Sequence, residues 1–251
     1  GGIQQCSNFV LDALYHIKGT DNRRLFRLRD KHSETVIDIA SENIISTSPF
    51  EKEIIKEGEY YFRGTSNQLK SIMWVIGKQF KRCKEIKKMG YNSIGFWTFA
   101  NGIYTDRFIE VTEDGIVEFE DNHFYLPAYS QLNKSTATDE EDDIYQSHRY
   151  YKYEPSAINI EDYLSLLNKV YKYKNNGRIA IAFLVASIFR DYIFSLYTCF
   201  PLLFLYGQTN SGKSQMVQSL SSVFAINRPP ANLNSITLAA LSTYTKDYKN
   251  T

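Results

Sequence analysis

The chain has 251 residues, of which 43% are apolar and 15% aromatic. This is enough apolar material for one large core or two modest ones, which excludes a disordered chain and a fibrous repeat. The 29 basic and 28 acidic side chains give a net charge of +1, so no field of one sign over the whole chain marks nucleic acid or a membrane as its partner.

The cysteines and histidines are too scattered for a disulfide framework or a zinc site. The cysteines are Cys6, Cys83 and Cys199, and no two of them have Cys-x-x-Cys spacing. Free thiols are typical of a reducing compartment, so we expect a cytoplasmic protein. The chain begins with Gly1-Gly2 and its first methionine is Met73, so we expect a piece or a processed form of a longer protein. No charged leader precedes an apolar stretch, so we expect no signal peptide in this sequence.

Charge is distributed unevenly along the chain. Residues 1–130 hold 17 basic and 18 acidic side chains, 131–148 hold one and five, and 149–251 hold eleven and five. The middle part contains the acidic run 139–143 and has little to bury, so we expect an acidic linker there. The run could instead imitate nucleic acid or bind a metal, but a solvated linker is the simpler interpretation. We therefore predict a mixed α+β module over 1–130 and a second domain over 149–251.

Three strands are predicted early in the module. Residues 24–30 and 35–40 alternate apolar and polar side chains around a polar turn, which indicates a β-hairpin. Residues 59–65 have the composition of another strand.

One basic amphipathic helix is predicted over 67–89, where apolar residues recur at three- and four-residue steps after a cap at Thr65 or Ser66. Its second half is strongly basic and could hold phosphates, or it could be a solvated face favoured by the helix dipole. The basic residues are Lys78, Lys81, Arg82, Lys84, Lys87 and Lys88.

After Gly90 we predict an antiparallel meander rich in Phe, Tyr and Trp. Short aromatic or β-branched runs are separated by Asn101-Gly102 and Asp114-Gly115, dipeptides that favour tight hairpin turns. Aromatic side chains on a sheet can stack on bases, as in single-strand binders, but in a small β domain most of them fill the core. We expect the aromatic side chains of this meander to fill the core.

Helices dominate the predictions beyond the linker. Residues 149–155 suggest a short strand, and Asn159 caps a helix that ends at Asn175-Asn176-Gly177. An apolar helix over 178–199 follows, and Pro201 stops it. The most apolar run in this helix is too short to cross a bilayer, so we expect no membrane partner.

The sharpest motif in the chain is the run GQTNSGKS, which satisfies G-x-x-x-x-G-K-[ST]. Five of the six residues before it are apolar or aromatic and predict a buried parallel strand, and the segment after it predicts a helix. Strand, glycine loop and helix are the setting of a phosphate-binding loop. The predicted nucleotide-binding residues are Gly207, Gln208, Thr209, Asn210, Ser211, Gly212, Lys213 and Ser214.

The spacing of this motif has a geometric reason. Successive backbone amides can point at phosphate oxygens only if the loop curls around the anion, and glycines permit the required angles and close approach. Lys213 would place a positive charge on the β- and γ-phosphates, and the hydroxyl of Ser214 would bind Mg²⁺. The alternative is a glycine turn without a ligand.

Binding does not imply hydrolysis. Phosphoryl transfer also needs an acidic residue at the end of a neighbouring strand to help hold Mg²⁺. After Phe224 the sequence has no apolar run that ends in Asp or Glu, and Asp247 is its only acid. We therefore predict an α+β N-terminal module followed by an incomplete α/β P-loop NTPase domain.

The glycine loop, the apolar helix before it and the aromatic runs GFWTFANGIYTD and HFYLPAYS resemble the P-loop helicase-like proteins of phages, plasmids and integrated elements. These bacterial proteins are akin to primase-helicases and carry a β-rich region before a RecA- or AAA-like core. The resemblance covers about residues 90–251 and implies ATP with Mg²⁺ at Gly207, Gly212, Lys213 and Ser214. The closing DYKNT is similar to the end of the acidic Mg²⁺ motif, without its second acid and its apolar lead-in.

The resemblance implies the ATP-binding part of a mobile-element replication helicase or related DNA-dependent ATPase, with DNA as a partner and assembly into a homo-oligomer. Arg178, Arg190 and Arg228 are the possible arginine fingers. One alternative is a nucleotide- or nucleic-acid-binding module without turnover. Another is a P-loop kinase, for which the sequence shows no acceptor-binding signature.

Overall fold

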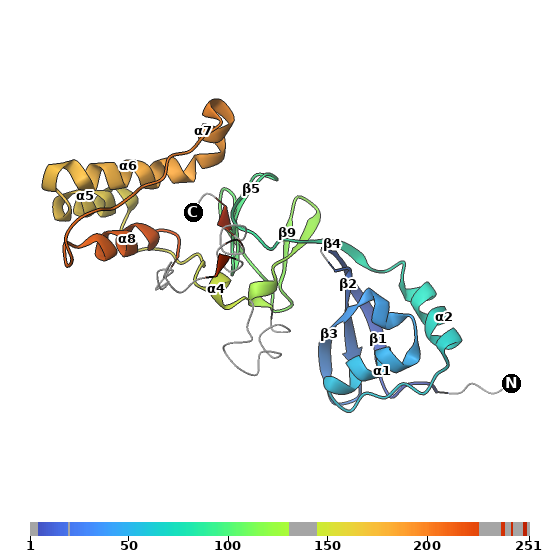
Figure 1. Cartoon of the computed structure of the whole chain (residues 1–251). Coiled ribbons are helices and arrows are strands. Elements are labelled where there is room, and N and C mark those ends of the chain that lie inside the picture. The colour runs from blue at the N-terminus through green and yellow to red at the C-terminus, as the bar shows by residue number, and fades with distance from the viewer. Residues whose placement is uncertain are drawn as a thin grey trace. The chain divides into compact units, whose positions relative to one another are not determined.

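The computed structural model describes residues 5–19, 21–130 and 145–225, together with 237, 238, 242, 248 and 249. The fold is mixed α+β, with a β-rich N-terminal part and helices later (Figure 1). The chain forms two compact units. Unit 1 comprises Gly1–Ile86 and Val111–Asp143, and unit 2 comprises Lys87–Glu110 and Ile144–Thr251.

The chain thus passes from unit 1 to unit 2 and back within the predicted module 1–130. The predicted acidic linker 131–148 lies outside the described residues except at its end, where Gln146–Arg149 form the short helix α4. The linker stays a prediction.

Unit 1 is built on a six-stranded sheet in the order β3-β2-β1-β4-β10-β9. Strand β4 pairs in parallel with β1 and β10, and the other pairs are antiparallel. The strands are β1 (Val10–Lys18), β2 (Arg23–Arg29), β3 (Glu34–Ala40), β4 (Lys81–Glu85), β9 (Ile116–Phe119) and β10 (Asn122–Tyr125).

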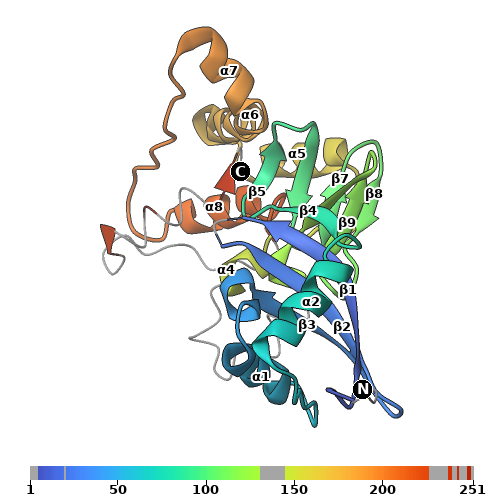
Figure 2. The ribbon, with the colours of Figure 1, turned by 90° about the vertical axis from the view of Figure 1, so that its right-hand side faces the viewer.

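Two helices cover one face of this sheet (Figures 1 and 2). They are α1 (Thr47–Lys56), which follows the short 3-10 helix η1 (Ser41–Ile44), and α2 (Ser66–Ile76). The helices and the sheet bury a common core that includes Phe26, Ile37, Phe50, Ile54 and Leu69. The helix-covered face of β2 and β3 is therefore the apolar face of the hairpin.

The predicted hairpin is confirmed, because β2 and β3 pair antiparallel over 23–40. The predicted strand 59–65 is wrong: Phe62 makes one isolated bridge to Ser7, and the neighbouring residues join no sheet. Phe62 is instead buried in the core beside the helices.

The predicted helix 67–89 is half right. Helix α2 begins with the predicted cap, since Thr65 and Gln68 form a capping box, but it ends at Ile76 before Gly77. The basic second half is not helical, because Lys81–Glu85 form strand β4 between β1 and β10. Pairing on both edges and burial of Cys83 favour the strand over the helix that the local pattern indicates.

Unit 2 contains a five-stranded sheet in the order β11-β5-β6-β7-β8. Its strands are β5 (Met89–Asn92), β6 (Phe96–Phe99), β7 (Gly102–Tyr104), β8 (Phe108–Glu110) and β11 (Tyr248–Lys249). The predicted meander is therefore divided between two sheets, since β9 and β10 belong to unit 1. The predicted turn at Asn101-Gly102 joins β6 to β7, and Gly115 lies at a turn with φ of 80° just before β9.

The predicted strand 149–155 is wrong, because these residues belong to no sheet. They are held by single hydrogen bonds instead: the amide of Ala100 donates to the carbonyl of Tyr151, and Asn101 bonds both backbone groups of Tyr153. The segment is thus tied to the β6–β7 turn by one backbone hydrogen bond and by two bonds to the side chain of Asn101, without forming a strand.

Besides the short α4, the helices described in unit 2 are α5 (Ile160–Val170), α6 (Asn176–Ile188), α7 (Arg190–Tyr197) and α8 (Lys213–Ser221), with the 3-10 turn η4 (Tyr173–Asn175) between α5 and α6. The predicted Asn159 cap is confirmed, since its side chain accepts from the amide of Asp162. The predicted end of α5 is wrong: the helix ends at Val170, and Asn176 and Gly177 already belong to α6.

The single apolar helix predicted over 178–199 is also wrong, because α6 and α7 are separate helices bent by 84° at Phe189. Among the described helices, none alone is long and apolar enough to cross a bilayer, although this bent pair passes the same test together.

Candidate functional site

The glycine-rich motif forms one continuous loop that leads into helix α8. Residues 207–212 are irregular and mostly exposed, and α8 begins at Lys213. The predicted helix after the motif is therefore confirmed. Because the eight predicted binding residues are consecutive, the loop brings all of them together at the N-terminus of α8.

Gly212 has the backbone conformation that only glycine adopts easily. Its φ is 82°, and it is the N-cap residue of α8. A Cβ at this position would meet no atom within 4 Å, so the requirement for glycine comes from the backbone angle and not from crowding. Asn210 also has a positive φ, of 62°. These left-handed residues curl the chain so that successive amides can face one side, as in an anion-binding nest.

The start of α8 leaves backbone amides available to a ligand. The first amide of this region with an intrahelical bond is that of Met216, which donates to the carbonyl of Gly212 at 2.9 Å. Gly212 has no side chain to cap the helix, and within the described residues the amides of Lys213 and Ser214 donate no hydrogen bond to protein. Such amides, together with the positive end of the helix dipole, favour an anion.

Lys213 folds back over the loop. Its Nζ donates to the carbonyls of Gly207 at 2.9 Å and Gln208 at 2.6 Å, and to Oγ of Ser211 at 3.2 Å. The ammonium group is thus held at the loop by backbone oxygens rather than by a carboxylate. A phosphate could replace these carbonyls as the acceptor and would add a full charge to the interaction.

The remaining motif side chains lie at the surface. Gln208, Thr209, Asn210, Ser211 and Ser214 are exposed. The side chain of Ser214 makes no hydrogen bond to the described residues, so its hydroxyl is available to a ligand. The described residues contain no group of three or more His, Cys, Asp or Glu side chains that could hold a metal ion. Any Mg²⁺ here would therefore be held by the Ser214 hydroxyl and the phosphates of its nucleotide.

The other predicted contributors are Asp247 and the three possible arginine fingers. Asp247 and Arg228 lie outside the described residues. Arg190 pairs with its neighbour Asp191 at 3.6 Å, and Arg178 is exposed near the start of α6. No arginine finger is therefore assigned.

The predicted buried strand before the motif is wrong. Residues 201–206 belong to no sheet, and Leu202, Phe204 and Tyr206 are 93%, 85% and 92% exposed. The segment still alternates, because Leu203 and Leu205 turn inward and line a pocket. An apolar run can form a buried strand only when neighbouring strands pair with it, and no described residue does so.

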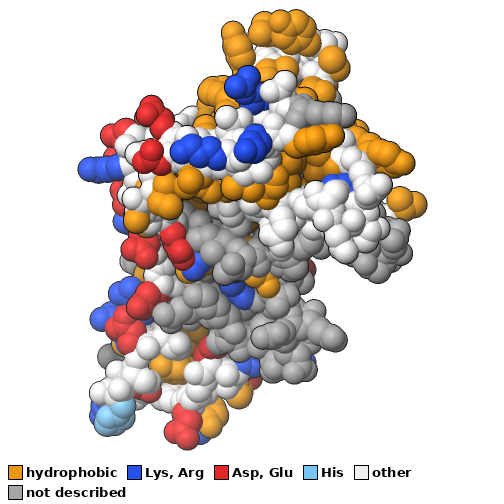
Figure 3. All heavy atoms as spheres, turned by 90° about the vertical axis from the view of Figure 1, so that its left-hand side faces the viewer, with side chains coloured by type: hydrophobic (Ala, Val, Ile, Leu, Met, Phe, Trp, Pro, Cys, Tyr) orange, Lys and Arg blue, Asp and Glu red, His pale blue; other side chains and the backbone are white. Residues whose placement is uncertain are grey.

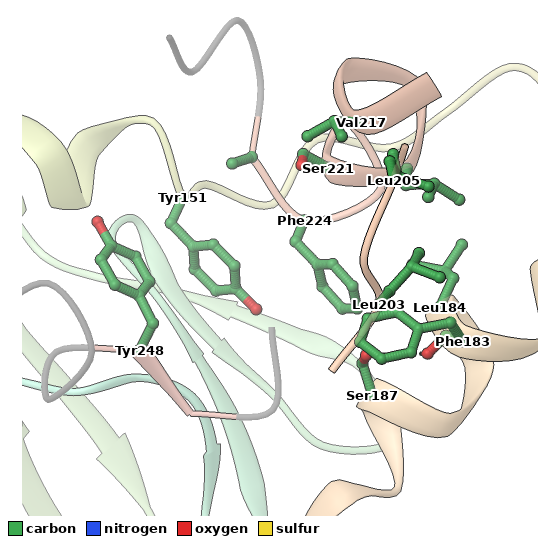
Figure 4. Close-up of a pocket in the computed structure, with 12 residues that line it drawn as sticks. Tyr151, Phe183, Leu184, Ser187, Leu203, Leu205, Val217, Ser221, Phe224 and Tyr248 are labelled. Atoms are coloured by element: carbon green, nitrogen blue, oxygen red, sulfur yellow. Dashed lines mark hydrogen bonds between the residues drawn. The ribbon is translucent and has the colours of Figure 1, made fainter. Parts of the chain in front are cut away.

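The pocket has a volume of about 500 Å³ and lies beside α8 (Figure 4). The side chains that line it include Tyr151, Phe183, Leu184, Leu203, Leu205, Val217, Leu220 and Phe224. Tyr151 stacks on Phe224 with ring centroids 6.3 Å apart, and both rings point into the hollow. The lining side chains of α8 begin one turn beyond the motif, so the pocket is the apolar interior behind α8 rather than the phosphate end of the loop.

Sequence reasoning missed this pocket. Its lining comes from residues 151, 183–187, 203–205 and 217–225, and also from Tyr248. Only the alternation in 201–206 and the apolar face of α8 were visible as local signals. Helix α8 is further held by α5, since the hydroxyl of Tyr163 donates to the carbonyl of Ser219.

Comparison of the sequence with protein-family models and with curated proteins finds no match. The geometry of the loop is therefore the main physical evidence on function.

Proposed function

We propose that residues 207–221 are the phosphate-binding loop and the following helix of a P-loop NTPase domain, and that the loop binds ATP with Mg²⁺. The observation that carries this proposal is the position of Lys213, whose ammonium lies over the loop on the carbonyls of Gly207 and Gln208 while the amides at the start of α8 are unused. A triphosphate would satisfy both the ammonium and the amides.

A row of exposed apolar side chains precedes the loop. Large apolar side chains in an extended segment are costly to leave in water, and Leu202, Phe204 and Tyr206 form one such row. Exposed apolar side chains also gather over the helices of this unit (Figure 3). In the proposed P-loop domain this row would be covered by other apolar side chains rather than left in water.

At the level of the whole protein, we propose the ATP-binding part of a cytoplasmic replication helicase or related DNA-dependent ATPase of a mobile element, acting as an oligomer on DNA. Support for this wider role comes from the resemblance of the motif and the aromatic β segment to the helicase-like proteins named above. In this proposal Gly207–Ser214 hold the nucleotide, Ser214 contributes to Mg²⁺ binding, and DNA is the partner of the motor.

The test is equilibrium binding of a fluorescent, non-hydrolysable ATP analogue in the presence of Mg²⁺. Lys213→Ala removes the charged contact and should weaken binding by about tenfold to a hundredfold, since hydrogen bonds to charged groups contribute about 1.5–3 kcal/mol. Lys169→Ala is the matched control, because it removes an exposed lysine from α5 of the same unit.

Inorganic tripolyphosphate should compete with the analogue, and adenosine should compete poorly, because the loop is expected to recognise the phosphate tail. Equal affinity of the Lys213→Ala variant and the wild type would contradict the proposal. Tight binding without turnover in a chain extended past Thr251 would favour the binding-module alternative, and a phosphorylated small-molecule product would favour a kinase.

A further inference from the structure

A cluster of basic side chains lies on one face of the sheet in unit 1. The cluster, here called the basic face, consists of His16 and Lys18 on β1, Arg24 on β2, and Arg82 and Lys84 on β4. Two of its members, Arg82 and Lys84, come from the basic second half of the predicted helix, and the structure places both in β4 instead.

The strand register puts these side chains together. His16 lies opposite Arg24 in the β1–β2 pair and opposite Arg82 in the β1–β4 pair, and Lys18 lies opposite Lys84. Residues directly opposite in neighbouring strands, and residues two apart along one strand, project to the same side of a sheet. The five side chains therefore occupy one face over three adjacent strands.

This face is the one that α1 and α2 partly cover. Arg24 is two residues from Phe26, which is buried in the core beneath the helices, and the Arg24 guanidinium lies 5.3 Å from the ring centre of Phe80. The basic face thus begins where the helical cover ends. Lys18, Arg82 and Lys84 are exposed there.

The arginines on the opposite face of β2 are paired within the protein. Arg23, Arg27 and Arg29 each pair with a carboxylate, at 2.9, 3.0 and 2.7 Å. Their partners are Asp38, Glu34 and Asp12. On the basic face, none of the five side chains forms an ion pair with any described residue. The two faces of one strand therefore differ in whether their charges are neutralised within the protein.

The surroundings of His16 also indicate a positive cluster that is not neutralised within the described residues. Burial lowers the pKa of His16, and the positive charges of Arg24, Lys18 and Arg82 lower it further. The field at the centre of the cluster is thus positive, and like charges held this close are unfavourable unless an anion binds between them.

We propose that the basic face of unit 1 binds the phosphodiester backbone of a nucleic-acid strand. The cluster spans three strands that are about 4.8 Å apart and extends about 7 Å along them, so it is wider than a single phosphate and fits several in succession. Arginine and lysine are the residues that position phosphates, and the exposure of Lys18, Arg82 and Lys84 suits a long polyanion that lies along the surface. This site does not involve the loop at 207–214, so its test is independent of the nucleotide proposal.

The experiment is a fluorescence anisotropy titration of the full chain with a labelled single-stranded oligothymidylate over a series of salt concentrations. The double variant Arg82→Ala/Lys84→Ala removes two exposed charges from the basic face. The control Lys52→Ala/Lys81→Ala removes two exposed charges elsewhere in unit 1, since Lys52 is on α1 and Lys81 projects from β4 to the opposite face beside Tyr15.

The basic-face variant should bind about tenfold or more weakly at low salt, and the slope of log affinity against log salt should shrink by about 1.4, since each phosphate neutralised on a single strand contributes about 0.7. The control should change affinity less than about twofold. The Lys213→Ala variant should bind the strand as the wild type does.

Three results would overturn the proposal. The first is absence of binding by the wild type at low salt. The second is an equal loss in both double variants, which would mean that only net charge matters. The third is competition by polyglutamate as strong as that by unlabelled oligothymidylate, which would point to an acidic protein partner. Far-ultraviolet circular dichroism of each variant establishes that the fold is retained.

Discussion

Asn101 links two segments of unit 2 that are far apart in the sequence. Its Nδ2 donates to the carbonyl of Tyr153 at 2.9 Å, and its Oδ1 accepts from the amide of Tyr153 at 2.8 Å. Both bonds are partly buried. A net contribution of about 1 kcal/mol for each hydrogen bond gives about 2 kcal/mol for the pair. We therefore expect Asn101→Ala to lower the free energy of unfolding of unit 2 by about 2 kcal/mol.

The expected loss can be measured by urea unfolding followed through tryptophan fluorescence. Trp97 lies on β6 of unit 2 and is half-buried, whereas Trp74 on α2 is 72% exposed and changes little on unfolding. Asn122→Ala is the control, because Asn122 donates one exposed hydrogen bond to the carbonyl of Glu120 in unit 1. An Asn101→Ala variant with the wild-type midpoint would refute the reasoning that these bonds fix the 150–154 segment.

Three other predictions test individual features. Gly212→Ala should cost about 1–2 kcal/mol of backbone strain and weaken ATP binding, whereas Gly95→Ala, also at a positive φ in open space, should show the strain alone; normal ATP binding by Gly212→Ala would contradict this. Burial raises the pKa of Asp38 from 3.8 to about 6 despite its ion pair, so its contribution to stability is present below about pH 4 and is lost as pH rises through 6. The wild type should lose up to about 3 kcal/mol more than Asp38→Asn between about pH 4 and pH 7 in urea titrations, and parallel curves would refute the assignment. Burial also raises the pKa of the Cys83 thiol to about 12, so iodoacetamide should modify exposed Cys199 first and Cys83 only on unfolding, as mass spectrometry would show.

Local signals in the sequence predicted local structure well. The caps at Thr65 and Asn159 and the alternation in 24–40 each depend on residues within one element or one turn, and all three are confirmed. The eight residues of the phosphate-loop motif are also consecutive, so the sequence alone places them in one loop, while their role in nucleotide binding stays a prediction.

Structure that depends on distant partners was predicted poorly. The run KRCKE has a helical pattern in isolation, but as β4 it pairs on both edges with strands far away in the sequence. The apolar run 201–206 shows the reverse, since its composition indicates a buried strand while no described strand pairs with it. The basic face could not be foreseen either, because the register that aligns His16, Arg24 and Arg82 is set by three strands and not by one.

The most direct test of the phosphate-loop assignment is a titration of the ¹⁵N-labelled chain with Mg²⁺ and ATP, followed through the backbone amide resonances. If the loop binds the phosphates, the amides of Gly212, Lys213 and Ser214 shift together and saturate, while the amides of Gly95 and its turn stay in place. Saturable shifts elsewhere in the chain with these three amides unmoved, or no shift at all, would contradict the assignment.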